Sequence, residues 1–192
     1  MAVVTEKREV PDEVYEDHDG WRLEIYREQD PIDPRNGNRF GTMLCSHERY
    51  RLGDEQIDTD RFDGWSDVRR HIKQERDAAV ILPLYLVDHG VQRMKTEPFN
   101  NPWDSGQVGF IYATGEELSN SDRDGEEIRE RLKSIVDEYD SYLTGDVWRY
   151  ELYDETGGML DSCGGFISLD YERIFNSAGL DRKDFEEKEV DA

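Results

Sequence analysis

The sequence has few cysteines, few lysines and no long apolar run. Its 192 residues include two cysteines, Cys45 and Cys163, which cannot form the disulfide framework of a small secreted protein. The first ten residues, MAVVTEKREV, lack the apolar core of a signal peptide. The longest apolar run, Ala78–Val87, contains a proline and is too short to cross a bilayer. These absences predict a cytoplasmic protein with no signal peptide and no membrane partner.

The shortage of lysine belongs to a strongly acidic composition. There are 46 acidic residues against 24 basic ones, of which 18 are arginine and 6 are lysine, and the net charge is -22. No basic stripe is present to release counterions from a phosphate backbone, so direct binding of nucleic acid is not expected.

Two explanations of this charge stay open. In a halophile, molar salt shortens the Debye length to ~3 Å, so that crowded carboxylates stop repelling one another. In a nucleic-acid mimic, carboxylates imitate phosphates and occupy a nucleic-acid-binding partner. Acidic residues occur in every segment of the chain, including both ends, rather than in one block. This spread favours the halophile.

The alternation of strand and helix patterns predicts an α+β fold, a mostly antiparallel sheet with two to three helices packed on one face. Residues 124–143 place apolar side chains on one helical face behind a capping pair, Asp124 and Glu127. Residues 147–153 and 159–163 flank the hairpin signal DETGG.

No break in composition marks a domain boundary. We therefore expect a single domain over residues 19–180. A flexible acidic tail is expected over residues 1–18, and a short helix or acidic tail over residues 181–192.

Two glycine-rich segments resemble each other: NPWDSGQVG at 101–109 and DSCGG at 161–165. In a hydrolase, Ser105 or Cys163 could act as nucleophile, glycine amides could bind an oxyanion, and His89 beside Asp88 could be the base. The alternative is that the glycines serve turns and close packing while Asp and Ser bond the local backbone. The candidate catalytic residues are thus Asp88, His89, Asp104, Ser105 and Cys163, and the candidate binding residues are Trp103, Asp104, Gln107 and Asp161.

A metal site is a further alternative. Cys45, His47, His89 and Cys163 are the ligand types of a Cys2His2 zinc site. Structural zinc sites usually show paired spacings, which this chain lacks, so buried thiols and surface imidazoles are the competing interpretation. No cofactor is expected.

Five segments together resemble a known family. They are GTMLCSHERYRLGDE, ILPLYLVDHG, PFNNPWDSGQVGFIY, YDSYLTGDVW and DSCGGF, within residues 37–170. In combination they are similar to small acidic proteins carried by phages, archaeal viruses and plasmids. That family has no established activity, so the resemblance implies no catalytic residue. It implies an accessory gene of a mobile element, in a halophilic archaeal setting.

The sequence therefore predicts a non-enzymatic accessory protein of a virus or plasmid that binds a host or viral protein. The partner could itself bind nucleic acid, and counter-defence through the acidic surface is one version of this role. The alternative is a small hydrolase or metal-dependent enzyme that uses the turn at 104–109 with His89 and Cys163. A structural protein of a virion is a third hypothesis. The oligomeric state is left open.

Overall fold

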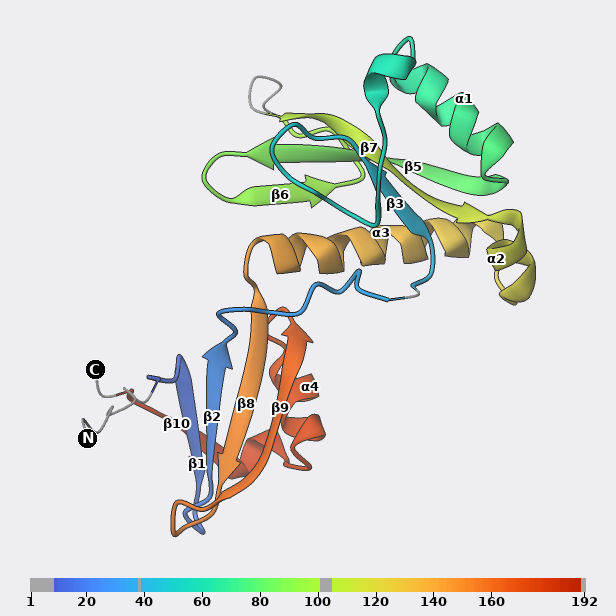
Figure 1. The fold of residues 1–192 in the computed structure, drawn as a ribbon. Helices are drawn as coiled ribbons and strands as arrows, with labels where there is room; N and C mark the ends of the chain where they lie inside the picture. Colours follow the sequence, from blue (N-terminus) through green and yellow to red (C-terminus); the bar gives the residue numbers. More distant parts are fainter. Residues whose placement is uncertain (1–8, 38, 101–104, 191–192) are drawn as a thin grey trace, which may run out of the picture. The chain divides into compact units, whose positions relative to one another are not determined.

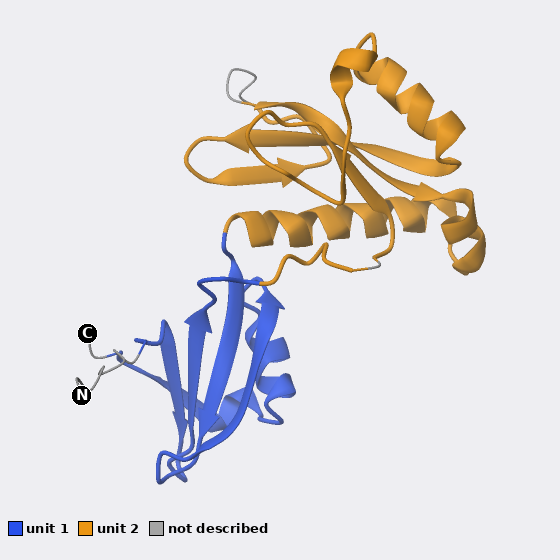
Figure 2. Ribbon diagram, viewed as in Figure 1, with its two compact units in different colours: residues 1–31, 145–192 blue, residues 32–144 orange. Residues whose placement is uncertain are grey.

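The chain forms two compact units in a computed structural model that describes residues 9–37, 39–100 and 105–190 (Figure 2). Unit 1 comprises residues 1–31 and 145–192, and unit 2 comprises residues 32–144. Unit 2 is therefore an insertion into unit 1, whereas the sequence predicted one domain over residues 19–180. The junction near residue 31 lies in an irregular loop that contains Pro31, Pro34 and Gly37, and the junction near residue 145 is a short turn. Both have the sequence of ordinary loops, which is why the division was not predicted.

Unit 1 is a five-stranded antiparallel sheet with one α-helix packed against it (Figure 1). Alternate residues of its strands, such as Leu23 and Ile25, enter a core that they share with Ile174 and Phe175 of the helix. The strand order is β10-β1-β2-β8-β9. The elements are β1 Glu13–Asp17, β2 Arg22–Arg27, β8 Val147–Tyr153, β9 Met159–Ile167, α4 Tyr171–Ser177, the 3-10 helix η2 Arg182–Asp184 and β10 Phe185–Lys188.

Both predicted tails contribute a strand to this sheet. β1 lies inside the expected tail 1–18, and β10 follows a single 3-10 turn where a helix or tail was expected. Two aromatic side chains account for the difference. Tyr15 and Phe185 each pack edge-on against Phe175, with ring centroids 5.4 and 5.5 Å apart, and their burial orders strands that are otherwise acidic.

Unit 2 is a mostly antiparallel sheet with a helix on each face. Its strand order is β4-β3-β7-β5-β6, and only the β3–β4 pair is parallel. Ile128, Leu132 and Val136 of α3 share a core with one set of strand residues, and Val68 and Ile72 of α1 share a core with the alternate set. The elements are β3 Thr42–Cys45, β4 Glu55–Gln56, the 3-10 helix η1 Thr59–Arg61, α1 Trp65–Glu75, β5 Ala78–Asp88, β6 Gln92–Lys95, β7 Ser105–Thr114, α2 Gly115–Asn120 and α3 Gly125–Leu143.

The apolar run Ala78–Val87 is the long strand β5, and its Pro83 is accommodated by partial pairing. On one side β5 pairs with β7 along its length, with Pro83 opposite Phe110. On the other side β6 pairs only with Tyr85–Asp88. Pro83 therefore lies in the half of the strand that β6 does not reach, where a missing N–H breaks no β5–β6 hydrogen bond.

The predicted α+β fold is confirmed, together with the hairpin of β8 and β9. The arrangement differs from the expected one in having two sheets and, in unit 2, helices on both faces. Among the described residues, no helix is both long enough and apolar enough to span a membrane.

Candidate functional site

Strand β9 is the last strand at one side of the unit 1 sheet, and its side chains are unusually open. Among the described strands it pairs with β8 alone. All seven residues from Met159 to Gly165 are exposed, and burial resumes only at Phe166. Met159 and Leu160 are 57% and 48% exposed although both are apolar. This open edge, residues 159–165, presents backbone groups that a further strand could pair with.

The composition of the open edge contrasts with that of the whole chain. The segment MLDSCGG carries a single charge, on Asp161, in a chain of which 36% of residues are charged. Soluble proteins usually guard edge strands with lysine, proline or several charges, because a bare edge invites pairing with another chain. The open edge contains no lysine and no proline, and its only charged residue is Asp161.

A β-bulge at Gly164 and Gly165 ends the open edge. Phe166 lies opposite Trp148 and Cys163 opposite Tyr150, so two glycines face Arg149 alone. The Gly165 N–H donates to Glu28 Oε1 at 2.6 Å, and Gly165 has a φ of 78°.

Both glycines are needed at the bulge. A Cβ at Gly164 would lie 2.4 Å from Glu28 Oε1, and a side chain at Gly165 would be strained by the positive φ. The oxyanion role suggested for these amides is thus contradicted at Gly165, because a carboxylate of the protein itself occupies that N–H.

The Asp161 side chain is held by a residue of the neighbouring strand β8. The Tyr150 hydroxyl donates to Asp161 Oδ2 at 2.6 Å. Burial first, and this hydrogen bond second, raise the pKa of Tyr150 to about 12. Asp161, a predicted binding residue, is therefore a fixed carboxylate in the middle of the open edge.

The two cysteines lie in different environments. Cys163 is exposed on the open edge of unit 1, whereas Cys45 is buried in β3 of unit 2. Burial first, and the nearby Asp54 second, raise the pKa of Cys45 to about 12. A thiol held protonated in this way is a poor metal ligand and a poor nucleophile.

The predicted base and the predicted serine nucleophile lie at one end of unit 2. Ser105 begins β7 opposite Val87, and Asp88 and His89 follow directly at the end of β5. The Asp88 carboxylate is bound by the Arg49 guanidinium. Cys163 belongs to unit 1, so the structure does not bring it to His89 within one unit. Trp103 and Asp104 lie outside the described residues.

Gly109 of β7 serves close packing. A Cβ at Gly109 would lie 2.1 Å from the Leu44 carbonyl oxygen, so β3 can approach β7 only if this residue has no side chain. Gln107 donates through Nε2 to the Gly109 carbonyl oxygen at 3.2 Å. Close packing thus accounts for Gly109, whereas a Cβ at Gly106 would meet open space.

The proposed zinc ligands are not gathered within one unit. Cys163 lies in unit 1 and the other three residues in unit 2. His47 Nδ1 accepts the N–H groups of Arg49 and Tyr50 at 3.2 and 3.3 Å, so it caps a turn. Its ring stacks on Tyr50 with centroids 5.0 Å apart.

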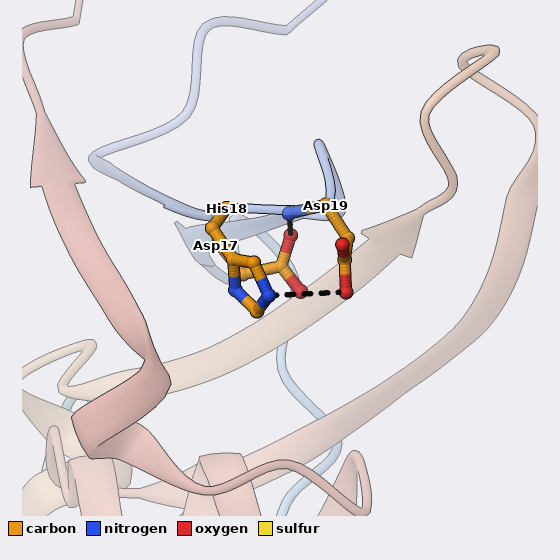
Figure 3. Close-up of side chains that lie close together, drawn as sticks. All are labelled: Asp17, His18 and Asp19. Atoms are coloured by element: carbon orange, nitrogen blue, oxygen red, sulfur yellow. Dashed lines mark hydrogen bonds and ion pairs between the residues drawn. The ribbon is translucent and has the colours of Figure 1, made fainter.

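Within the described ranges, three neighbouring side chains offer ligand atoms within 4.8 Å of one another: Asp17, His18 and Asp19 (Figure 3). Asp17 Oδ1 accepts the N–H groups of Asp19 and Trp21 at 3.0 and 2.8 Å. These bonds close the turn between β1 and β2, which explains the group without an ion.

The pattern Arg-x-Glu-x-Tyr occurs at residues 22–26 and again at 149–153, and none of these residues was among the predicted site residues. The two copies pair antiparallel in β2 and β8, with Glu24 opposite Glu151. Each arginine lies over the tyrosine of the other strand: Arg22 over Tyr153 at 5.3 Å, and Arg149 over Tyr26 at 4.0 Å.

Within each copy the glutamate is held by its own strand. Tyr26 and Tyr153 donate to Glu24 and Glu151, both at 2.5 Å. Arg149 donates to Glu151 at 2.5 Å, and Arg22 Nε forms an ion pair with Glu24 Oε1 at 3.0 Å without a hydrogen bond. Alternation within β2 places this cluster on the face opposite α4, where Tyr26 is only 2% exposed. The cluster joins β2 to β8, and repetition of the motif is the signal that could have revealed it.

No protein-family model, curated protein or solved structure matches this chain. A function is therefore proposed from the geometry of each unit.

Proposed function

We propose that this protein is a non-enzymatic binding module that pairs an extended, basic segment of a partner protein with the open edge of β9. The observation that carries the proposal is the run of seven consecutive exposed residues at the margin of the unit 1 sheet. Strand addition uses such an edge: backbone hydrogen bonds give affinity, and alternate side chains give specificity.

The open edge has the parts that strand addition needs. The five residues that precede the bulge, Met159–Cys163, offer about 16 Å of backbone at about 3.3 Å per residue. Met159 and Leu160 supply exposed apolar contacts at one end. Asp161 supplies a fixed negative charge, and the bulge clamped by Glu28 limits the pairing at the other end.

Charge selects a basic partner. Unit 1 contains 23 acidic and 9 basic residues, and unit 2 contains 23 acidic and 15 basic residues. The unit that bears the open edge therefore carries most of the net negative charge, and complementary charge favours a basic segment. Nucleic-acid-binding proteins of a host are rich in such segments.

The proposed setting is that of a virus or plasmid in a halophile, with counter-defence as one version of the role. The acidic composition and the resemblance of five segments to proteins of mobile elements support this setting.

Crosslinking from Cys163 tests the proposal. A benzophenone maleimide reacts with the exposed thiol at the centre of the open edge, because Cys45 is buried. The labelled protein is irradiated in a high-salt extract of a halophilic archaeon. We expect one dominant adduct with a basic protein, crosslinked through a segment that is extended in the complex. A matched control carries the label on α2, through Cys163→Ser with Ser119→Cys.

Competition makes the test specific. Unlabelled protein is expected to suppress the adduct, whereas the double variant Met159→Lys with Leu160→Lys is expected not to. A charge-matched competitor, Ile32→Lys with Val91→Lys, changes two exposed apolar residues of unit 2 and should compete like the unaltered protein. Equal labelling from α2, or full competition by the 159/160 variant, would refute binding at the open edge.

A further inference from the structure

A cavity of about 250 Å³ in unit 2 is lined by three arginines, in a chain that otherwise carries a large excess of acid. Arg35 and Arg39 come from the segment before β3, and Arg131 comes from α3. Pro34, Phe40 and Ile135 form the apolar part of the wall. Glu138 is the carboxylate of the lining.

Arg35 has a structural role in this cavity. Its guanidinium is buried and donates to both Asp54 oxygens, through Nε at 3.1 Å and Nη2 at 2.6 Å. Nη2 also donates to the Gly41 carbonyl oxygen at 2.8 Å. The charge of Arg35 is thus offset by Asp54, and these bonds fix the segment that carries Arg39 and Phe40.

The charges of Arg39 and Arg131 are not offset by a carboxylate in this way. Arg131 lies over the Phe40 ring, 3.9 Å from its centroid, and Arg39 Nε donates to the Asn36 carbonyl oxygen at 3.3 Å. Within the described residues, neither guanidinium has a carboxylate oxygen within 4.0 Å. By contrast, Arg129 on the same helix is paired with Glu126. Two arginines without a carboxylate, one of them oriented by an aromatic ring, therefore share one cavity.

We propose that this cavity binds a small oxyanion group, a carboxylate or a phosphate, between Arg39 and Arg131. Guanidinium groups present paired N–H donors in the geometry that carboxylates and phosphates match. The apolar wall fits an organic body attached to the anion. A volume of about 250 Å³ suits a small ligand better than a drug-sized one. This site is independent of the open edge of β9.

Glu138 allows a test in which two kinds of substitution have opposite expected effects, because its negative charge repels a bound anion. Loss of an arginine should weaken binding, and neutralisation of Glu138 should strengthen it. Since charge-assisted hydrogen bonds contribute about 1.5–3 kcal/mol, Arg131→Met and Arg39→Met should each weaken binding about tenfold or more. Glu138→Gln should strengthen it about two- to fivefold, as expected for one exposed charge interaction. Arg129→Met is the matched control and should leave the affinity unchanged.

The experiment is a titration of the full chain followed by the arginine side-chain N–H signals in NMR, at constant ionic strength. Inorganic phosphate, acetate and phenyl phosphate are titrated separately. Stronger binding of phosphate or of acetate identifies the preferred oxyanion, and stronger binding of phenyl phosphate than of phosphate shows a contribution of the apolar wall.

The expected result is saturable binding of at least one probe that is weakened by both arginine variants and strengthened by Glu138→Gln. Arg39→Met keeps the test decisive if Arg131→Met unfolds, since Arg39 is exposed and no cation–π contact with a described ring involves it. Absence of saturable binding for all three probes, or equal binding by Arg39→Met and the unaltered chain, would overturn the proposal.

Discussion

At the residue scale, the Glu28 carboxylate holds the bulge at which the exposed part of β9 ends. It receives the Gly165 N–H and occupies the space that a side chain at Gly164 would need. The sequence pattern DSCGG suggested backbone N–H groups that bind a substrate anion. In the structure the anion bound by the Gly165 N–H is the protein's own Glu28 carboxylate. The environment of these glycines depends on Glu28, which lies more than one hundred positions away in the sequence.

Substitution of Gly165 by alanine should destabilise unit 1. A non-glycine residue at a φ of 78° is strained, by about 1–3 kcal/mol. We expect Gly165→Ala to lower the protection of β8 and β9 amides in hydrogen exchange by that amount. Gly106→Ala is the control, because Gly106 has no atom within 4 Å of an added Cβ. Equal protection in the two variants would contradict the role given to the bulge.

The two thiols should react at very different rates. With a pKa of about 12, Cys45 is ionised in about one molecule in ten thousand at pH 8, and it is also buried. A thiol reagent at pH 8 should therefore titrate one cysteine in the folded chain and two in denaturant. Cys163→Ser should abolish the fast reaction, and a fast reaction that survived this change would show that Cys45 is accessible.

At the element scale, α3 was predicted nearly residue for residue because its signals are local. Asp124 accepts the N–H groups of Glu126 and Glu127, and Glu127 in turn accepts the Asp124 N–H. Its apolar side chains repeat with the helical period. Such signals act between neighbours in the chain and need no tertiary information.

Removal of this cap should cost stability. We expect Asp124→Ala to reduce the free energy of unfolding of unit 2 by about 1 kcal/mol, since two N–H groups lose their acceptor. Urea unfolding followed by helical circular dichroism measures the change. Asp122→Ala removes a neighbouring charge outside the cap and should have a smaller effect. A cap variant as stable as this control would contradict the prediction.

The strands β1 and β10 could not be predicted from local pattern. They are short and largely acidic, and each is ordered by one aromatic residue that packs on Phe175. That contact joins positions near both ends of the chain, so no window of sequence contains it. The exposure of β9 was not predicted for a similar reason, because edge position is a property of the sheet and not of the strand.

At the scale of the whole molecule, the division into two units was the largest miss. Residues 31 and 145 are separated by the whole of unit 2, yet they delimit the same unit. The segment at residue 31 contains Pro31 and Pro34, but it is typical of an ordinary turn-rich loop, and the junction at residue 145 has a single glycine. Strand pairing between β2 and β8 therefore had to be known before the boundary could be found.

Stability should fall in alkali. Burial, followed by hydrogen bonds to carboxylates or by nearby charges, raises the pKa of Tyr15, Tyr26, Tyr139 and Tyr150. For Tyr139 and Tyr150 it is raised to about 12 from 10.

Because the folded state holds these protons more tightly than the unfolded state, their contribution is complete below pH 10 and is lost as pH rises toward 12. We expect the thermal midpoint to fall across this window. Tyr150→Phe should make the fall shallower, and a midpoint constant from pH 9 to 11.5 would contradict the prediction.

Low salt should destabilise unit 1 before unit 2. Unit 1 carries 23 acidic and 9 basic residues in fewer positions than unit 2 uses for 23 and 15. At 0.1 M salt the Debye length is about 10 Å, compared with ~3 Å at 1 M, so repulsion within unit 1 is less screened. Hydrogen exchange at both salt concentrations should show the larger loss of protection in β8 and β9. A larger loss in β5 and β7 would contradict this order.

The insertion of unit 2 between β2 and β8 also sets an order during synthesis. All of residues 32–144 leave the ribosome before β8, β9, α4 and β10 do, so unit 2 can fold while unit 1 consists only of β1 and β2. A folded unit 2 replaces a flexible loop of more than one hundred residues by a compact body. Its folding therefore removes most of the entropic cost of bringing Arg27 to its partner Trp148. Unit 1, and with it the edge of β9, is then completed only after unit 2.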